Sequence, residues 1–287
     1  MRRAFSIMLL FFCFQSLADS TPEVIVSIKP LQLITNEIMR GAGNADLLID
    51  SHQSPHHFQL RPSQLTLASS ADLLIWISNE FETGLKRLQT ILPSSSKGLQ
   101  LASELPVEQL IGEGHDLDGH LWLSAENVIT ISELIAHQLS TLNPANGTLY
   151  QANSQRLTNK LKAWQQQTFE QLENAKPGYV LDHQFLAYFE RSFDLQNSGS
   201  LRNSHDHGGS IKQLKQLHAQ LADSTPRCLL VSSLPASKQA LQISQRYQLE
   251  IKLINTLGEA SEPETIIDLL NDIAITLQQC SSTRPNI

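Results

Sequence analysis

Residues 23–28 of the chain read Glu-Val-Ile-Val-Ser-Ile, a compact run with three consecutive β-branched side chains. A helical pattern follows the run and ends at Gly41. Residues 45–50 (ADLLID) and 72–78 (DLLIWIS) are two further apolar runs of strand length. Continuous apolar runs are typical of strands that are covered on both faces, as in a parallel sheet. This alternation of strands and helices predicts an α/β architecture built from βαβ units.

The longest helical pattern covers about residues 145–175. Its apolar side chains fall on one stripe at helical spacing, and they are Tyr150, Leu157, Leu161, Trp164 and Leu172. A helix of about thirty residues, at 1.5 Å per residue, is roughly 45 Å long, enough to run the length of a two-lobed molecule. We therefore interpret this segment as a rigid helix that joins two lobes.

The α/β pattern restarts after this helix. Further strand-like runs are residues 179–181, 228–232 and 250–254, and a final helix is predicted from Pro263 to Cys280. We predict two similar α/β lobes with mainly parallel sheets and a ligand cleft between them. The predicted segments are a signal peptide, an N-terminal lobe, a linker helix and a C-terminal lobe, at residues 1–18, 19–144, 145–175 and 176–287.

The first eighteen residues have the composition of a signal peptide. Arg2 and Arg3 are positively charged, residues 7–14 are apolar, and residues 16–18 (SLA) end in a small residue that a signal peptidase accepts. The apolar run is too short to span a bilayer. We expect cleavage near Asp19 and export to the periplasm.

Charge and composition exclude several classes of protein. With 41% apolar and 17% charged residues the chain is globular rather than disordered or fibrous. Cleavage would remove two arginines and no acid, which lowers the formal net charge from −7 to −9. Such a surface repels nucleic acid and anionic membranes and attracts cations weakly. We expect no nucleic-acid partner and a monomeric protein.

Cleavage would also remove Cys13 and leave Cys228 and Cys280. Two cysteines of an exported protein are more often bonded than free, because the compartment is oxidising. A bridge across these 52 positions would stabilise the fold by roughly 4 kcal/mol on the chain-entropy model. We predict a disulfide, and two buried thiols are the alternative.

Three histidines from distant parts of the chain share one context. His56 lies in a loop that Pro55 and Pro62 stiffen, and His120 and His183 also lie where an extended segment meets a loop or helix. Ligands of open α/β sheets bind at this carboxyl edge, so two facing lobes would bring the three imidazoles together. Imidazole suits zinc and other late first-row ions. For the His56 loop alone, two solvated histidines are the alternative.

These residues resemble the signature blocks of the metal-binding solute-binding proteins of ABC transporters, and most closely their periplasmic zinc-binding branch. The similar segments follow the family's order over nearly the whole chain: residues 54–63 (SPHHFQLRPS), 120–124 (HLWLS), His183 with 188–190 (YFE), the pair Cys228 and Cys280, and residues 256–258 (TLG).

The resemblance implies two α/β lobes joined by one long rigid helix, with the metal between the lobes. It implies that His56, His120 and His183 bind the metal. It further implies that the protein captures Zn²⁺ in the periplasm and delivers it to a membrane permease, without catalysis.

The chain departs from the family's pattern at several positions. In the loop at residues 255–258, which we call the late loop, Asn255 stands where the family usually has Asp. Gln184 follows the third histidine, at a position where Asp is common in the family. Asn carries no charge, which favours three imidazoles with water as the fourth ligand and disfavours Mn²⁺, because Mn²⁺ prefers carboxylate oxygens. The His- and acid-rich loop of many zinc-specific members is reduced to a few residues. Candidates for a fourth or accessory contact are Glu113, His115 and Asn255.

Three alternative functions remain open. The first is a binding protein for Mn²⁺ or another late divalent ion, and the second is an adhesin or a binder of another solute on the same fold. The third is a zinc hydrolase in which three histidines and the metal activate water. A hydrolase also needs a positioned general base, and none is evident beside the three blocks.

The other histidines are interpreted as lesser candidates. Adjacent side chains of an extended chain point apart, so we expect His57 to lie at the rim of the site rather than to bind metal. The triplet at residues 205–207 (His-Asp-His) is interpreted as a solvated turn, with weak surface metal binding as the alternative. His52, His137 and His218 lie among polar residues and are interpreted as incidental.

Overall fold

The structure of the protein is a computed structural model. It describes residues 21–280 except 52, 57, 87, 89–91, 93–95, 105–106, 112–116, 176–177, 203–209 and 260–261. The following predictions therefore fall outside the described residues: the signal peptide at residues 1–18, the interpretations of His52, His57 and residues 205–207, and the accessory contacts Glu113 and His115.

The N-terminal region contains, within the described residues, a parallel sheet of the strands β1 (Val24–Val26), β2 (Asp46–Leu47), β3 (Leu73–Trp76) and β4 (Lys97–Gln100), in the order β2-β1-β3-β4. Every residue of β1 and β3 is buried, as the continuous apolar runs predict. The chain leaves β1 for β2 on one side and returns to β3 on the other. The carboxyl ends of β1 and β3 therefore form a topological switch point, where ligands of such sheets bind.

The helices that the described residues form in this region are α1 (Lys29–Met39), α2 (Pro62–Ser70) and α4 (Ala125–Leu142), with single 3-10 turns at η1 (Thr83–Leu85), η2 (Leu101–Ser103), η3 (Leu121–Leu123) and η4 (Pro144–Asn146). Helix α2 begins at Pro62 because proline, with its fixed φ and no amide proton, suits a first helical position. The Arg61 amide donates to Gln64 Oε1 at 2.9 Å and completes this helix start.

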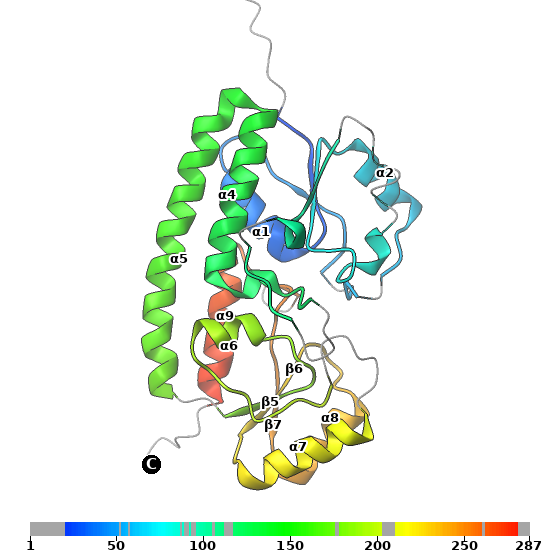
Figure 1. Ribbon diagram of the computed structural model, residues 1–287, viewed down its shortest axis with the longest axis vertical. Helices are drawn as coiled ribbons and strands as arrows, with labels where there is room; N and C mark the ends of the chain where they lie inside the picture. The colour runs from blue at the N-terminus through cyan, green and yellow to red at the C-terminus, as the bar shows by residue number, and fades with distance from the viewer. Residues whose placement is uncertain are drawn as a thin grey trace, which may run out of the picture.

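Helix α5 (Gly147–Ala175) has 29 residues, which gives a length of about 44 Å. It runs along the long axis of the molecule beside α4 (Figure 1), and it packs against α1, α4 and α9. The predicted stripe is buried at Tyr150, Leu157, Leu161 and Leu172. The predicted linker helix is confirmed. It begins two residues later than predicted, because residues 144–146 form η4, which the Asn143 side chain caps.

The C-terminal region contains, in the described part of the chain, a parallel sheet of β5 (Tyr179–Leu181), β6 (Cys228–Val231) and β7 (Glu250–Leu253), in the order β5-β6-β7. Its helices are α6 (Ala187–Ser192), α7 (Ile211–Asp223), α8 (Lys238–Tyr247) and α9 (Ile266–Gln279). Helix α9 begins at Ile266 and not at Pro263, because the Thr265 side chain caps it by accepting from the Asp268 amide.

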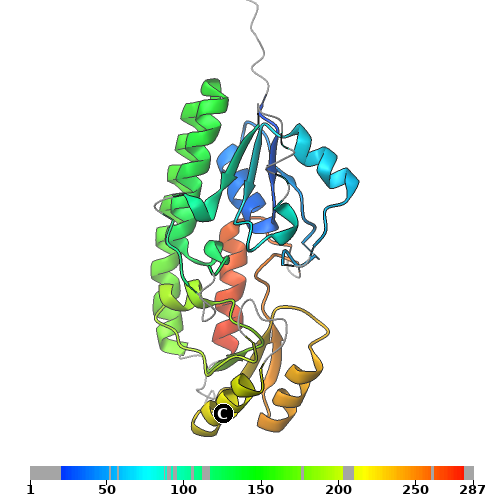
Figure 2. The same cartoon turned by 45° about the vertical axis from the view of Figure 1, so that its right-hand side comes forward.

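The two faces of the C-terminal sheet belong to different apolar clusters. On one face Val180 and Leu229 pack with Leu217 of α7 and Ile243 of α8. On the other face alternate residues such as Leu230 join a larger cluster that continues into the N-terminal sheet and includes α9. Figures 1 and 2 show α7 and α8 at one end of the molecule, on the side of the sheet away from α9. The two lobes therefore share a continuous apolar core.

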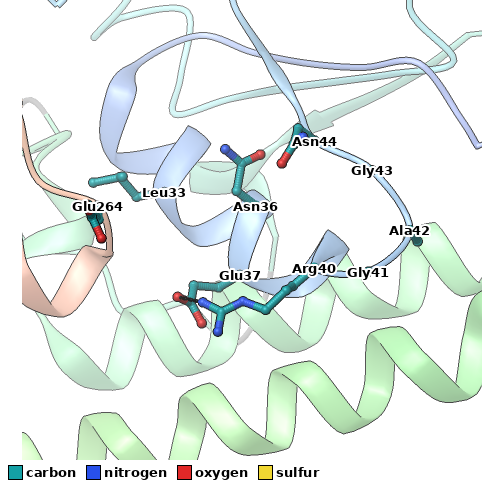
Figure 3. A pocket seen from close by; sticks show the side chains of 9 residues that line it. All are labelled: Leu33, Asn36, Glu37, Arg40, Gly41, Ala42, Gly43, Asn44 and Glu264. Atoms are coloured by element: carbon teal, nitrogen blue, oxygen red, sulfur yellow. Dashed lines mark hydrogen bonds and ion pairs between the residues drawn. The ribbon is translucent and has the colours of Figure 1, made fainter.

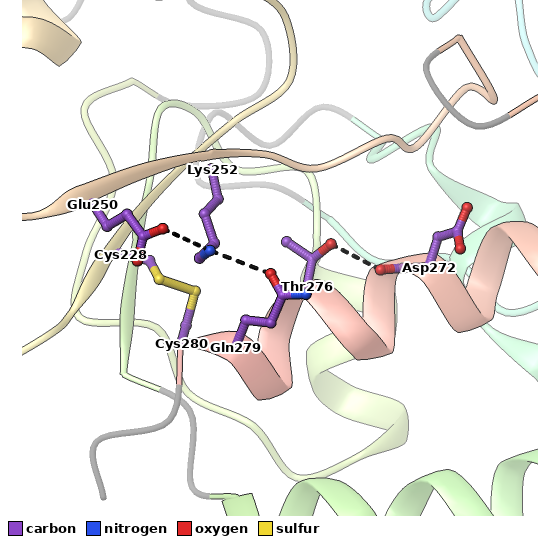
Figure 4. Close-up of a disulfide and its surroundings, with 7 residues drawn as sticks. All are labelled: Cys228, Glu250, Lys252, Asp272, Thr276, Gln279 and Cys280. Carbon is purple, nitrogen blue, oxygen red and sulfur yellow. Dashed lines mark hydrogen bonds and ion pairs between the residues drawn. A yellow bond between two sulfur atoms is a disulfide. The ribbon is translucent and has the colours of Figure 1, made fainter. Parts of the chain in front are cut away.

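A disulfide joins Cys228, the first residue of β6, to Cys280 at the end of α9, with Cα atoms 5.6 Å apart (Figure 4). Beside it Lys252 of β7 pairs with Glu250 at 2.8 Å and donates to Gln279 Oε1 of α9 at 3.2 Å. The predicted disulfide is confirmed, and it attaches the last helix to the C-terminal sheet. Within the described residues, a membrane-spanning helix of sufficient length and apolarity is absent.

Candidate metal centre

The structure brings the three predicted histidines to one place between the lobes. His56 lies in the loop between β2 and α2, His120 immediately precedes η3, and His183 lies two residues after β5. The ring centroids of His56 and His120 are 6.0 Å apart, and those of His120 and His183 are 6.5 Å apart. Segments from both lobes therefore contribute an imidazole to the same site.

The His120 imidazole is held by an aspartate two residues earlier. Its Nδ1 lies 2.7 Å from Asp118 Oδ1, which also accepts from the His120 amide at 3.1 Å. Both side chains are almost fully buried. An ionised carboxylate only accepts hydrogen bonds, so Nδ1 carries the proton and the lone pair of Nε2 is left to bind a metal ion.

The His183 imidazole is held in the same way by the preceding residue. Its Nδ1 lies 2.9 Å from Asp182 Oδ1. Asp182 is itself fixed: its amide donates to the carbonyl of Leu230 in β6 at 2.9 Å, and Arg202 Nη2 lies 3.6 Å from its second carboxylate oxygen. His183 thus has the same tautomer as His120, and its position follows from the carboxyl end of the C-terminal sheet.

The His56 ring packs against Phe81, which follows β3. The ring centroids are 4.6 Å apart in an edge-on arrangement, and Phe81 also meets the His120 ring at 5.2 Å. Thr83 donates its hydroxyl to the carbonyl of His56 at 3.0 Å. Gly84 allows this close approach, since a Cβ atom there would lie 2.6 Å from the carbonyl oxygen of Phe58. The turn at residues 81–84 therefore holds the His56 loop in place.

A buried carboxyl group, Glu82, holds this turn at the switch point of the N-terminal sheet. Its carboxyl group accepts a hydrogen bond from the hydroxyl of Ser27, at the end of β1. It also accepts from the backbone amides of Ile77 and Ser78, at the end of β3, and these two bonds are each 2.9 Å long. Burial raises the pKa of Glu82 to about 7, although these hydrogen bonds lower it. Glu82 thus fixes the turn that carries Phe81.

Contacts between the lobes close the site. The Trp122 indole N–H donates to the carbonyl of Thr256 in the late loop at 2.9 Å. Phe185 lies 4.8 Å from the His183 ring and 6.5 Å from the His120 ring, between centroids. Trp122, Phe185 and Phe81 are buried, so aromatic side chains pack around the three imidazoles.

The spacing of the rings can be compared with that of a bound ion. With zinc–nitrogen distances of about 2.0–2.1 Å, three imidazoles on a tetrahedral ion have ring centroids roughly 5 Å apart. The observed 6.0 and 6.5 Å are wider by about 1 Å. In the described part of the chain, no group of three or more His, Cys, Asp or Glu side chains is arranged to hold a metal ion.

The accessory contact Asn255 lies in the loop that follows β7. Its Oδ1 accepts from the amide of Glu259 at 2.7 Å, so the side chain stabilises the turn that leads to Gly258, at a φ of +81°. The other two accessory candidates lie outside the described residues. A fourth contact to the metal stays a prediction.

A separate hollow of about 450 Å³ lies at the C-terminal end of α1 (Figure 3). Asn36, Glu37, Arg40 and Asn44 line it together with Glu264 from the segment before α9. Glu37 and Arg40 form an ion pair there. The hollow shares no lining residue with the imidazole site.

The roles of Phe81 and Glu82, and of Asp118 and Asp182, in holding the imidazoles were not predicted from the sequence. For the two aspartates a usable signal was present, since they lie one or two residues before His183 and His120. For Phe81 the sequence carries no local signal, because its partners His56 and His120 lie on other segments.

Comparison with known proteins identifies the family of the chain. The sequence model of the family described as "ZnuA: Zinc-uptake complex component A periplasmic" matches residues 24–280. The high-affinity zinc uptake system protein ZnuA of Brucella suis biovar 1 is 22% identical over 320 residues, which cover 94% of this chain and 95% of that protein.

Solved structures show the same fold. A crystal structure of ZnuA superposes with a TM-score of 0.81 at 22% identity, covering 91% of this chain and 100% of that one. A Mn-bound periplasmic metal binding protein from Candidatus Liberibacter asiaticus superposes with a TM-score of 0.76 at 18% identity, covering 90% and 98%. These likenesses show the fold, and the match of the family model over residues 24–280 shows that the chain belongs to the ZnuA family of periplasmic zinc-uptake components.

Proposed function

We propose that the protein captures Zn²⁺ in the periplasm with His56, His120 and His183 and delivers it to the membrane permease of an ABC transporter. As a member of the ZnuA family it is a metal-binding protein of zinc uptake and not an enzyme. The observation that carries the proposal is the pair of aspartates that hold Nδ1 of His120 and His183. Imidazoles held in this way are pre-oriented for a metal ion.

The donor set favours zinc over manganese. Nitrogen donors suit Zn²⁺, whereas Mn²⁺ prefers carboxylate oxygens, and Asp118 and Asp182 are already engaged with histidine nitrogens. One structural neighbour is described as Mn-bound, so the fold itself does not select the metal. The selection is therefore assigned to the three imidazoles.

Capture and release follow from the spacing of the rings. Binding would draw the imidazoles together by about 1 Å, with water as the fourth ligand. Because protons compete with zinc for the same nitrogens, acidification weakens binding. Release at the permease requires the lobes to move the imidazoles apart. We further propose that the chain is exported through a signal peptide at residues 1–18 and acts as a monomer.

A calorimetric titration of metal-free protein with zinc, and with zinc in competition with manganese, tests the proposal. His56→Ala, His120→Ala and His183→Ala should each weaken zinc binding sharply. His137→Ala on α4 and His218→Ala, whose ring contacts Tyr247, are matched controls and should bind as the wild type. Unchanged affinity in two of the three site variants, or a preference for manganese, would contradict the proposal.

A further inference from the structure

Tyr188 of α6 reaches from the C-terminal lobe to the segment that carries His120. Its side chain is buried, and its hydroxyl accepts a hydrogen bond from the Leu110 amide at 2.8 Å and donates one to the carbonyl of Asp118 at 2.9 Å. Burial raises the pKa of Tyr188, which keeps the hydroxyl protonated. Both partners belong to the N-terminal lobe.

The hydroxyl takes the place of a missing ladder bond. Ile111 and Leu117 form an antiparallel bridge, so Leu110 and Asp118 lie directly opposite one another. In a regular antiparallel ladder such a pair exchanges two N–H···O bonds. Here the Asp118 amide donates directly to the Leu110 carbonyl at 2.9 Å, while the Leu110 amide and the Asp118 carbonyl are joined through the Tyr188 hydroxyl.

The hydrogen bonds of the Tyr188 hydroxyl fix Asp118, the residue that orients His120. The main chain of Asp118 is held by Leu110 and Tyr188, and its carboxylate holds Nδ1 of His120. Tyr188 also follows His183 by five residues on the segment that leaves β5. A displacement between the two lobes at this point therefore changes the distance between the His120 and His183 imidazoles.

A second contact from α6 acts on the same segment. Arg191 Nη2 lies 2.8 Å from Glu108 Oε1, and the main chain of Glu108 is paired with the side chain of Asn127 in α4. Arg191 is mostly exposed, so this ion pair contributes little by itself. The buried hydroxyl is the stronger of the two contacts, because it makes two hydrogen bonds, to the Leu110 amide and the Asp118 carbonyl, away from the exposed surface.

We propose that Tyr188 is a positioning residue for the zinc site, whose hydroxyl sets the spacing of the His120 and His183 imidazoles across the lobes. The inference rests on the proposed function. Tyr188→Phe keeps the buried ring and removes only the two hydrogen bonds. Loss of a group that orients a metal-binding side chain weakens metal affinity by about 10- to 100-fold.

The matched control is Tyr179→Phe. Tyr179 is another buried tyrosine of the same lobe, and its hydroxyl donates to Glu190 Oε1 of α6 at 2.9 Å rather than to Leu110 or Asp118. A general loss of stability lowers the melting temperature of both metal-free variants. The positioning role lowers zinc affinity only in Tyr188→Phe.

The experiment measures zinc dissociation constants by competition with a chelating dye, for wild type, Tyr188→Phe, Tyr179→Phe, Asp118→Asn and the double variant Tyr188→Phe/Asp118→Asn. If Tyr188 acts through Asp118, Tyr188→Phe lowers zinc affinity less when Asp118→Asn is already present than it does in the wild type, because the two changes are coupled. Equal zinc affinity of Tyr188→Phe and wild type, or additive effects, would overturn the positioning role alone. A wild type that binds no zinc would overturn the proposed function and the inference with it.

Discussion

Phe81 and Gly119 pack so closely that a Cβ atom at residue 119 would lie 2.1 Å from the phenyl ring. The glycine immediately precedes His120, and the same ring meets the imidazoles of His56 and His120. The absence of a side chain at residue 119 therefore lets one aromatic ring support two of the three imidazoles.

Gly119→Ala is expected to displace Phe81 and disturb the site. Overpacking of this kind costs about 1–3 kcal/mol of unfolding free energy, and displacement of both imidazoles should weaken zinc binding roughly tenfold. Urea denaturation and zinc titration measure the two effects. Gly147→Ala, where a Cβ would make an ordinary contact of 3.4 Å with Ser140, is the control and should change neither. Wild-type zinc affinity in Gly119→Ala would show that Phe81 does not support the site.

Glu82 should make the metal-free protein less stable as the pH rises. In the unfolded chain its carboxyl group loses its proton near 4.5, whereas burial raises the pKa of Glu82 in the folded state to about 7. Between these values the folded state binds more protons, so the free energy of unfolding falls with increasing pH, by about 3 kcal/mol in total. Below pH 4.5 the group is protonated in both states and the loss is absent.

Glu82→Gln removes this contribution, and it is checked by urea denaturation in the presence of a chelator at several pH values from 4.5 to 8. The difference in free energy of unfolding, wild type minus variant, should fall as the pH rises across this interval. The amide that Glu82→Gln introduces can shift this difference by a constant amount, but it cannot make the difference depend on pH. A difference that does not depend on pH would contradict the prediction.

Trp122 should report zinc binding by its fluorescence. Its ring centroid lies 5.3 Å from that of His120, and its indole N–H donates to Thr256 across the lobes. A cation bound beside it changes the local field and the contact between the lobes. We expect the change in emission on zinc addition to disappear in Trp122→Phe and to persist in Trp164→Phe, with binding measured independently by calorimetry. A signal that survives in Trp122→Phe would place the metal elsewhere.

The disulfide should matter for stability and not for zinc binding. It joins the amino end of β6 to the end of α9, whereas His183 lies at the carboxyl edge of the same sheet. Replacing both Cys228 and Cys280 by Ser is expected to lower the free energy of unfolding by up to about 4 kcal/mol. Denaturation of oxidised wild type and of the double variant measures the loss, and zinc titration of both is the control. A large loss of zinc affinity in the folded variant would show that the bridge also shapes the site.

Much of the fold follows from short-range patterns. The runs at Val24–Val26 and Leu73–Trp76 are apolar at every position, so they predict buried parallel strands. The stripe from Tyr150 to Leu172 has helical spacing and predicts the long α5. Strand β4 (Lys97–Gln100) is not predicted from the sequence, because its four residues (KGLQ) form neither an apolar run nor an alternation of apolar and polar side chains, and two of them are exposed.

The sequence alone determined the two α/β halves, the helix between them and the disulfide pair, and it predicted the three histidines as metal ligands, since each rests on local periodicity, on residue type or on short motifs. Only the tertiary structure decided how those histidines are held. The contacts of Phe81 with Gly119, of Tyr188 with Leu110 and Asp118, and of Trp122 with Thr256 join segments far apart in the chain. Such contacts depend on the packing of the two lobes around their shared core. The residue pattern along one segment does not predict which residue of a distant segment will pack against it.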